Sequence, residues 1–68
     1  MIIEELENRF GAMAVGKGFI TSHRLVKALE IQARDNLVGG KRRLIGKVLF
    51  DLGFVTLPQI EEVLASMS

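Results

Sequence analysis

Apolar residues recur along most of this chain at the three- and four-residue spacing that is typical of one face of an α-helix. The pattern predicts four helices, over about residues 2–17, 22–37, 42–52 and 57–67. Between the second and the third helix, the stretch DNLVGGK contains two adjacent glycines, which predict a flexible connection. We therefore predict an all-α fold, a compact four-helix domain made of two helix hairpins.

An internal repeat relates the two halves of the sequence at an offset of 35 residues. Residues 9–33 align with residues 44–68 without a gap, and five aligned positions are identical. The identical pairs are Gly11 and Gly46, Gly18 and Gly53, Phe19 and Phe54, Thr21 and Thr56, and Leu29 and Leu64. We predict a single domain over residues 1–68 that consists of two helix–turn–helix repeats, with a linker at about residues 34–43.

Each repeat contains the same break between its two helices, the tetrapeptide Gly-Phe-Ile/Val-Thr. Glycine follows the last turn of many helices because it adopts the left-handed conformation without a steric cost, and this position is expected for Gly18 and Gly53. Threonine caps a helix by accepting a hydrogen bond from its first amides, which is the role expected for Thr21 and Thr56. The sequence Thr-Leu-Pro-Gln, which begins at Thr56, also has the spacing of a capping box.

Gly11 and Gly46 occupy corresponding positions inside predicted helices, where glycine costs about 1 kcal/mol of helix stability relative to alanine. Two explanations are open for this cost. Either another helix approaches closely at these positions, or the backbone is exposed there for a ligand.

From Arg9 to Gln32 the sequence is R-F-G-x-x-A-x-x-x-G-x-x-x-x-x-x-L-x-x-A-L-x-x-Q. This segment resembles a motif in the N-terminal domains of type II secretion and type IV pilus assembly ATPases, which begins with arginine and ends with glutamine. In that family the motif usually occurs twice in tandem, and in a subset of members the two copies together bind cyclic di-GMP. The resemblance implies ligand contacts at Arg9, Phe10, Gly11, Leu25, Ala28, Leu29 and Gln32.

The second repeat departs from the family motif at both polar ends, where Leu44 replaces the arginine and Met67 replaces the glutamine. Arg43 lies one residue before the arginine position, and a shift of one residue turns a helical side chain by about 100°. The connection between the repeats is also longer than the short spacer of the family. One half of the two-part ligand site is therefore incomplete. The sequence also contains no G-x-x-x-x-G-K-[ST] stretch of an ATPase domain.

The charges are unevenly distributed, although the net charge is only +1. Residues 17–47 contain eight lysines and arginines against two acidic residues, whereas the segments on either side are acidic. Within this stretch we expect a basic patch from Lys41, Arg42, Arg43 and Lys47. Two interpretations stay open: the segments of opposite charge attract one another within the fold, or the basic patch receives an anionic partner.

Residues that build catalytic and metal sites are scarce in this sequence. It contains no cysteine and a single histidine, which excludes disulfides, thiolate zinc sites and histidine-rich metal sites. Ser22 and His23 are adjacent, and neighbouring residues on a helix point in different directions, so we interpret them as a capping residue and a solvated ring. The acidic pairs at residues 4–5 and 61–62 lie near helix starts, where they complement the helix dipole. We therefore predict that the protein is not an enzyme and binds no cofactor.

Apolar residues make up 49% of the chain, but no apolar run approaches the roughly 20 residues that a membrane-spanning helix needs. The first residues include glutamates, unlike the basic start of a signal peptide. We expect a cytoplasmic protein that is not inserted in a membrane. A domain of this size buries only about 60% of the surface that its unfolded chain exposes, and a homodimer is one way to bury further apolar surface.

Three functions are open. We favour a non-catalytic protein-interaction or regulatory module, which docks on a partner in a bacterial secretion, pilus or signalling assembly through a helix face and the basic segment 41–47. The alternative implied by the resemblance is a receptor domain for cyclic di-GMP. The third is a helix-turn-helix-like DNA-binding protein, because the second predicted helix carries Arg24, Lys27 and Arg34.

Overall fold

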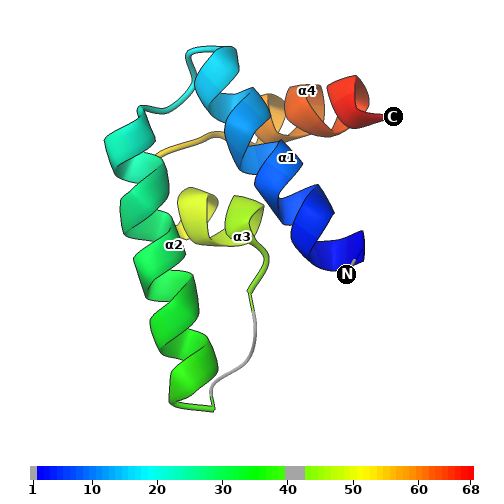
Figure 1. Ribbon diagram of the computed structural model, residues 1–68. Coiled ribbons are helices and arrows are strands. Elements are labelled where there is room, and N and C mark those ends of the chain that lie inside the picture. Colours follow the sequence, from blue (N-terminus) through cyan, green and yellow to red (C-terminus); the bar gives the residue numbers. More distant parts are fainter. Residues whose placement is uncertain (1, 40–42) are drawn as a thin grey trace.

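The computed structural model describes residues 2–39 and 43–68, and for residues 2–4 it describes the backbone alone. Within these ranges the chain forms four α-helices and no strand. The helices are α1 (Ile2–Gly16), α2 (Ser22–Leu37), α3 (Ile45–Asp51) and α4 (Leu57–Met67), shown in Figure 1. The prediction of an all-α, four-helix fold is therefore confirmed.

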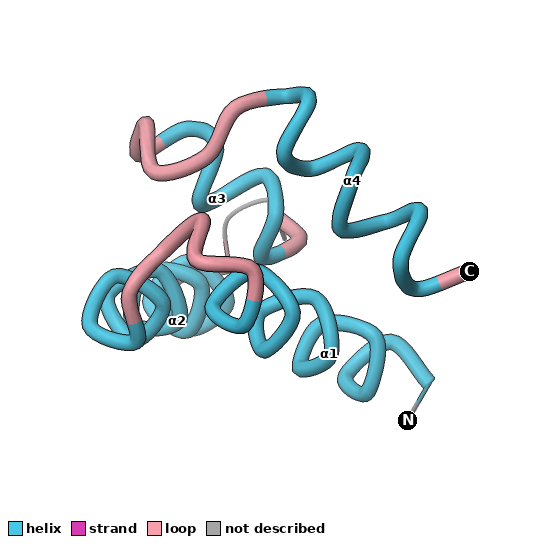
Figure 2. The backbone as a smooth tube through the Cα atoms, turned by 90° about the horizontal axis from the view of Figure 1, so that it is seen from above, coloured by secondary structure: helices cyan, strands magenta, loops and turns pink. Residues whose placement is uncertain are grey.

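The helices form two pairs, and α3 takes the central position. Figure 2 shows α1 and α2 in one layer and α3 and α4 in the other. In Figure 1, α3 lies between α1 and α2, and it contacts both, whereas α4 packs on α1. Since α3 has only seven residues, too few for a stable isolated helix, its formation depends on these contacts.

The turn between α1 and α2 has the same geometry as the turn between α3 and α4. Gly18 and Gly53 both have a φ of 77°, in the left-handed region, as predicted. The Phe19 amide donates to the Ala14 carbonyl over 3.0 Å, and the Phe54 amide makes the corresponding bond to Leu49 over 2.9 Å. These bonds lie 35 residues apart in the chain, and they end α1 and α3 in the same way.

The predicted threonine caps are also present. Thr21 Oγ1 accepts a hydrogen bond from the Arg24 amide over 3.2 Å, and Thr56 Oγ1 accepts one from the Gln59 amide over 3.3 Å. The Thr56 amide in turn donates to Gln59 Oε1 over 3.0 Å, which completes the capping box. Thr21 is the capping residue of α2, so the interpretation of Ser22 as a cap is wrong, and Ser22 is the first helical residue instead.

The buried core draws on all four helices and on both turns. Its apolar members among the described residues are Phe10, Ala14, Ile20, Ala28, Ile45, Val48, Leu49, Val55 and Val63. The three core residues of α3 have no exposed surface, which makes this short helix the centre of the fold. Burial of large side chains such as these stabilises the fold by about 1.5–3 kcal/mol each.

One predicted boundary is wrong. The third helix begins at Ile45 rather than at about residue 42, because Leu44 is extended, with φ −70° and ψ 155°, and serves as the helix N-cap. The second helix ends at Leu37, as the apolar pattern predicted, and it includes residues 34–37 of the stretch assigned to the linker. Lys41 and Arg42 of the predicted basic patch lie outside the described residues.

Candidate functional site

An open groove of 690 Å³ lies between α1, α3 and α4. It is lined by Leu6, Glu7 and Phe10 of α1, by Leu44, Gly46, Lys47 and Phe50 at and within α3, and by Leu57, Ile60, Leu64, Met67 and Ser68 at the end of the chain. Most of these side chains are apolar, and only Glu7 and Lys47 among them carry a charge. The groove is therefore suited to an apolar occupant rather than to a charged one.

Five large apolar side chains at the groove remain substantially exposed. Their exposed fractions are 44% for Leu6, 57% for Leu44, 37% for Phe50, 57% for Leu57 and 51% for Leu64. Single exposed apolar residues are common on protein surfaces, but a contiguous group of them marks an interaction site. The groove is therefore a candidate interaction surface.

The spacing of apolar residues along α4 explains how this helix serves both the core and the groove. Val63 is 1% exposed and belongs to the core. Leu57, Ile60, Leu64 and Met67 follow the three–four–three spacing of a coiled-coil seam, and all four line the groove. A helix with apolar residues on more than one face normally packs against neighbours on more than one side. In α4, one apolar side packs in the core and the second lines the open groove.

Gly46 forms part of the groove and allows α1 to approach α3. A Cβ atom at this position would lie 3.1 Å from Cζ of the Phe10 ring, and one at Gly11 would lie 2.9 Å from Cδ1 of Leu25. At both glycines, a side chain of another helix therefore packs directly against the backbone. Of the two explanations for these residues, the structure supports close approach of helices.

Next to the groove, Glu7 of α1 caps the N-terminus of α3. Its carboxylate oxygens accept the Ile45 amide over 2.9 and 3.1 Å. Gln32 Nε2 donates to Glu7 Oε1 over 2.8 Å and to the Arg43 carbonyl over 2.9 Å. Because Leu44 has no side chain that can cap α3, Glu7 takes over this function.

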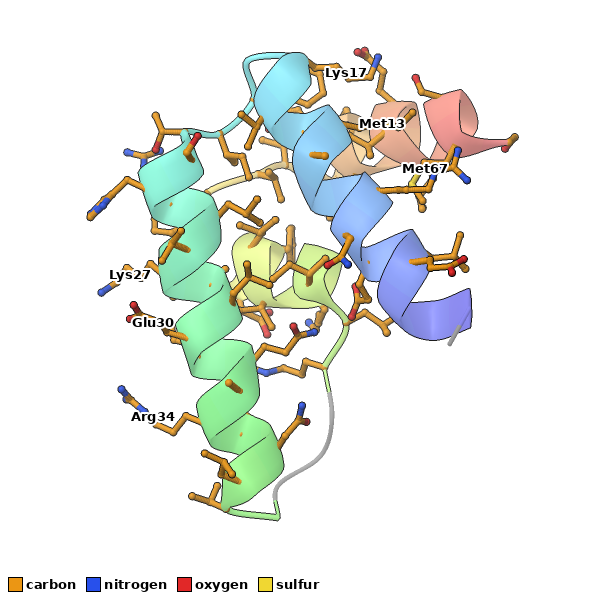
Figure 3. The ribbon with its side chains drawn as sticks, viewed as in Figure 1. Met13, Lys17, Lys27, Glu30, Arg34 and Met67 are labelled. Atoms are coloured by element: carbon orange, nitrogen blue, oxygen red, sulfur yellow. The ribbon has the colours of Figure 1, made fainter. Side chains whose placement is uncertain are left out.

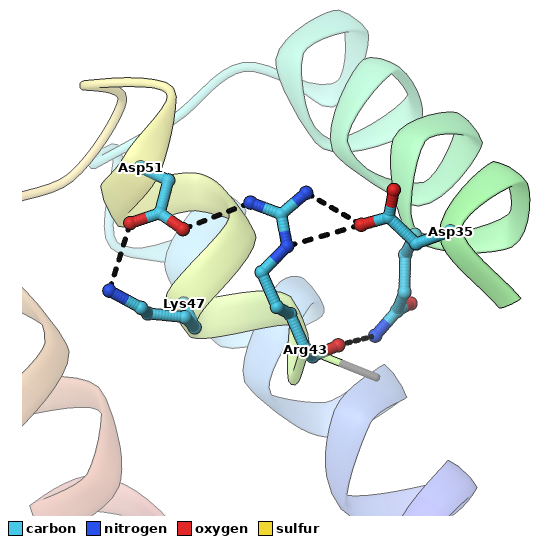
Figure 4. Close-up of polar contacts among 5 residues, drawn as sticks. Asp35, Arg43, Lys47 and Asp51 are labelled. Carbon is cyan, nitrogen blue, oxygen red and sulfur yellow. Dashed lines mark hydrogen bonds and ion pairs between the residues drawn. The ribbon is translucent and has the colours of Figure 1, made fainter. Parts of the chain in front are cut away.

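Arg43 lies between two carboxylates rather than at a ligand site (Figure 4). Its Nη2 lies 2.6 Å from Asp35 Oδ2, its Nη1 lies 2.9 Å from Asp51 Oδ2, and Lys47 Nζ lies 3.0 Å from Asp51 Oδ1. The bonds to Asp35 and then to Asp51 raise the pKa of Arg43. The bonds from Lys47 and then from Arg43 lower the pKa of Asp51. The two described residues of the predicted basic patch are therefore engaged within the molecule.

The structure places the residues of the family motif in different environments. Phe10 and Ala28 are in the core, at 6% and 0% exposure. Gly11 is covered by Leu25, and Gln32 bonds to Glu7 and to the Arg43 carbonyl. The side chains of Arg9 and Leu29 are exposed. Most of these residues therefore contribute to packing. Of the two polar ends, Arg9 is exposed to solvent, whereas Gln32 is engaged in hydrogen bonds.

The cations of α2 lie on its surface, and Figure 3 shows Lys27, Glu30 and Arg34 pointing away from the other helices. Arg24 is set apart from this row, because its guanidinium stacks over the Phe54 ring at 4.9 Å from the centroid. The acidic Glu30 lies between Lys27 and Arg34 in the row. The three cations predicted to contact DNA thus do not form one continuous row, and Glu30 beside two of them would repel phosphate.

Comparisons with protein-family models, with curated proteins and with solved structures find no match to this chain. Among its described residues, no helix is both long and apolar enough to cross a membrane. In the same part of the chain, no three acidic or histidine side chains are grouped as ligands of a metal ion. The groove was not among the sites that we predicted from the sequence, and the only signal for it was the excess of apolar positions in the last helix.

Proposed function

We propose that this chain is a non-catalytic protein-interaction module, which binds an amphipathic helix of a protein partner in the groove between α1, α3 and α4. The observation that carries the proposal is the group of five exposed apolar side chains at the groove. Because these side chains are already about half buried, covering the remainder of each is worth about 1 kcal/mol. A bound helix would therefore gain affinity mainly from apolar contact.

The shape of the apolar surface favours a helix as the occupant. The seam of Leu57, Ile60, Leu64 and Met67 has the spacing with which one helix packs against another. Phe50 and Leu44 supply the facing side of the groove from α3 and its N-cap. A helix with apolar residues at the same spacing fits between these two sides.

The resemblance to the N-terminal domains of secretion and pilus ATPases supports an adaptor or regulatory role in a bacterial secretion, pilus or signalling assembly. We expect the apolar groove, rather than the cations of segment 41–47, to be the docking surface. Arg43 and Lys47 are held by Asp35 and Asp51, so their charges are compensated within the molecule.

A fluorescein-labelled peptide of about two heptads, with leucine at the a and d positions and lysine elsewhere, tests the proposal. Fluorescence anisotropy should show saturable binding of this peptide but not of a scrambled peptide of the same composition. Leu64→Lys should weaken binding by about tenfold or more, because it removes one apolar contact from the seam and adds a charge that repels the lysines of the peptide. Ser66→Lys is the matched control, since it adds the same charge to an exposed position of α4 outside the groove lining. Equal binding by both variants would contradict the proposal.

Cyclic di-GMP is the second candidate ligand, and the exposed side chain of Arg9 is the observation that favours it. Its binding in the manner of the family would require Gln32 to leave its bonds and Ala28 to leave the core. We therefore expect no heat of binding when the protein is titrated with the dinucleotide in a calorimeter. Saturable heat that disappears in Arg9→Ala would contradict this expectation.

A further inference from the structure

The outer face of α2 carries a second set of exposed apolar side chains. Val26 is 52% exposed, Leu29 is 40% exposed and Leu37 is 86% exposed. With the exposed Ala33, they follow a spacing of three, four and four residues, which places them on one side of the helix. No residue of α2 lines the groove, so the outer face of α2 and the groove are separate surfaces.

A charged row borders this apolar face. In Figure 3 the side chains of Lys27, Glu30 and Arg34 extend from α2 away from the rest of the molecule. The two cations outnumber the single acid, so the row is basic on balance. The outer face of α2 therefore has the composition of a basic amphipathic helix.

The groove matches this face in spacing and length, and an acidic residue beside the α4 seam complements the basic row. The seam from Leu57 to Met67 covers ten residue steps, or about 15 Å of helix, and the α2 row from Val26 to Leu37 covers eleven, or about 17 Å. Glu61 is exposed on α4, four residues after Leu57, and therefore borders the seam on the surface of the helix. Its carboxylate is placed to attract the basic row of an incoming helix.

We propose that the groove of one copy of this chain takes the outer face of α2 of a second copy. This inference rests on the proposed function, because it names the occupant of the same groove. The two surfaces differ, so a linear assembly keeps one free groove at one end and one free α2 face at the other. Such head-to-tail contacts produce open chains or rings rather than a closed symmetric dimer.

Two single-surface variants of the full chain test the proposal. Val26→Glu places an acid on the α2 face, and Leu64→Lys places a base in the groove, both at positions where the side chain is half exposed. Leu37→Glu and Leu57→Lys are second variants of the same two surfaces, for use if circular dichroism shows that either first variant is unfolded.

In sedimentation velocity the wild-type chain should show a sedimentation coefficient that rises with concentration beyond that of a dimer. Each variant alone should remain monomeric, because each lacks one of the two surfaces. Their equimolar mixture should form a one-to-one dimer, in which the intact α2 face of Leu64→Lys occupies the intact groove of Val26→Glu. A wild-type chain that stays monomeric, or that stops at a dimer, would overturn the proposal, as would a mixture without dimer.

The leucine–lysine peptide separates failure of this inference from failure of the proposed function. If the wild-type chain does not associate but Val26→Glu binds the peptide, the groove takes a helix from another protein and only the self-association is wrong. If Val26→Glu neither binds the peptide nor pairs with Leu64→Lys, both proposals are wrong.

Discussion

Glu7 connects three parts of the chain through one carboxylate. It accepts the first amide of α3 and the amide group of Gln32, and Gln32 also fixes the Arg43 carbonyl. These bonds hold the extended residues directly before α3 in place. The apolar pattern alone predicted that those residues belong to the helix. Which residues form these hydrogen bonds depends on how α1 and α2 pack on α3. The sequence pattern could not predict this pair, because Glu7 and Ile45 are 38 residues apart.

Glu7→Gln should lower the free energy of unfolding by about 1–2 kcal/mol, because the start of α3 loses a charged acceptor. Urea unfolding followed by circular dichroism measures this change. Glu5→Gln is the control, as an exposed residue of the same helix that should change stability by less than about 0.5 kcal/mol. Equal effects of the two substitutions would show that Glu7 does not cap α3.

The ion pairs of Asp51 should make stability depend on pH in the acid range. Its pKa in the folded state is below the ordinary value of 3.8, so its contribution is complete above that value and disappears as the pH falls through the folded pKa. Thermal unfolding below about pH 4 should therefore show a steeper loss of stability in the wild type than in Asp51→Asn. Glu5→Gln, at an exposed position of α1, is the control. The idea fails if Asp51→Asn follows the wild-type curve.

At the scale of elements, the sequence was most informative at the helix ends. Gly18, Gly53, Thr21 and Thr56 act through their own neighbours, so their residue types alone predicted the two turns. Four pairs of core residues also lie 35 positions apart: Phe10 and Ile45, Ala14 and Leu49, Ile20 and Val55, and Ala28 and Val63. The start of α3 was not predictable in this way because a distant residue caps it.

Thr21→Ala and Thr56→Ala should each cost about 1 kcal/mol of stability, because each removes the acceptor for an amide in the first turn of a helix. The corresponding serine variants keep a hydroxyl and should retain most of the stability. Chemical denaturation of the four variants measures these differences. If serine is no better than alanine, the threonines do not act through the hydroxyl.

At the scale of the whole molecule, the fold leaves two apolar surfaces uncovered, the groove and the outer face of α2. A periodic pattern of apolar residues shows that a helix has an apolar face, but it does not show which face meets the core. In α4 both Val63 and Leu64 satisfy the pattern, yet the first is 1% exposed and the second 51%. The candidate site was therefore visible only once the three helices around it had been placed.

The central claim is that the groove binds a helix, and amide chemical-shift mapping by NMR tests it most directly. ¹⁵N-labelled Val26→Glu protein, which keeps the groove and lacks the α2 face, is titrated with the leucine–lysine peptide. We predict saturable shifts that concentrate at Leu44, Phe50, Leu57 and Leu64, with little change along the outer face of α2. Shifts that do not saturate, or that concentrate on α2 instead of the groove, would contradict the claim.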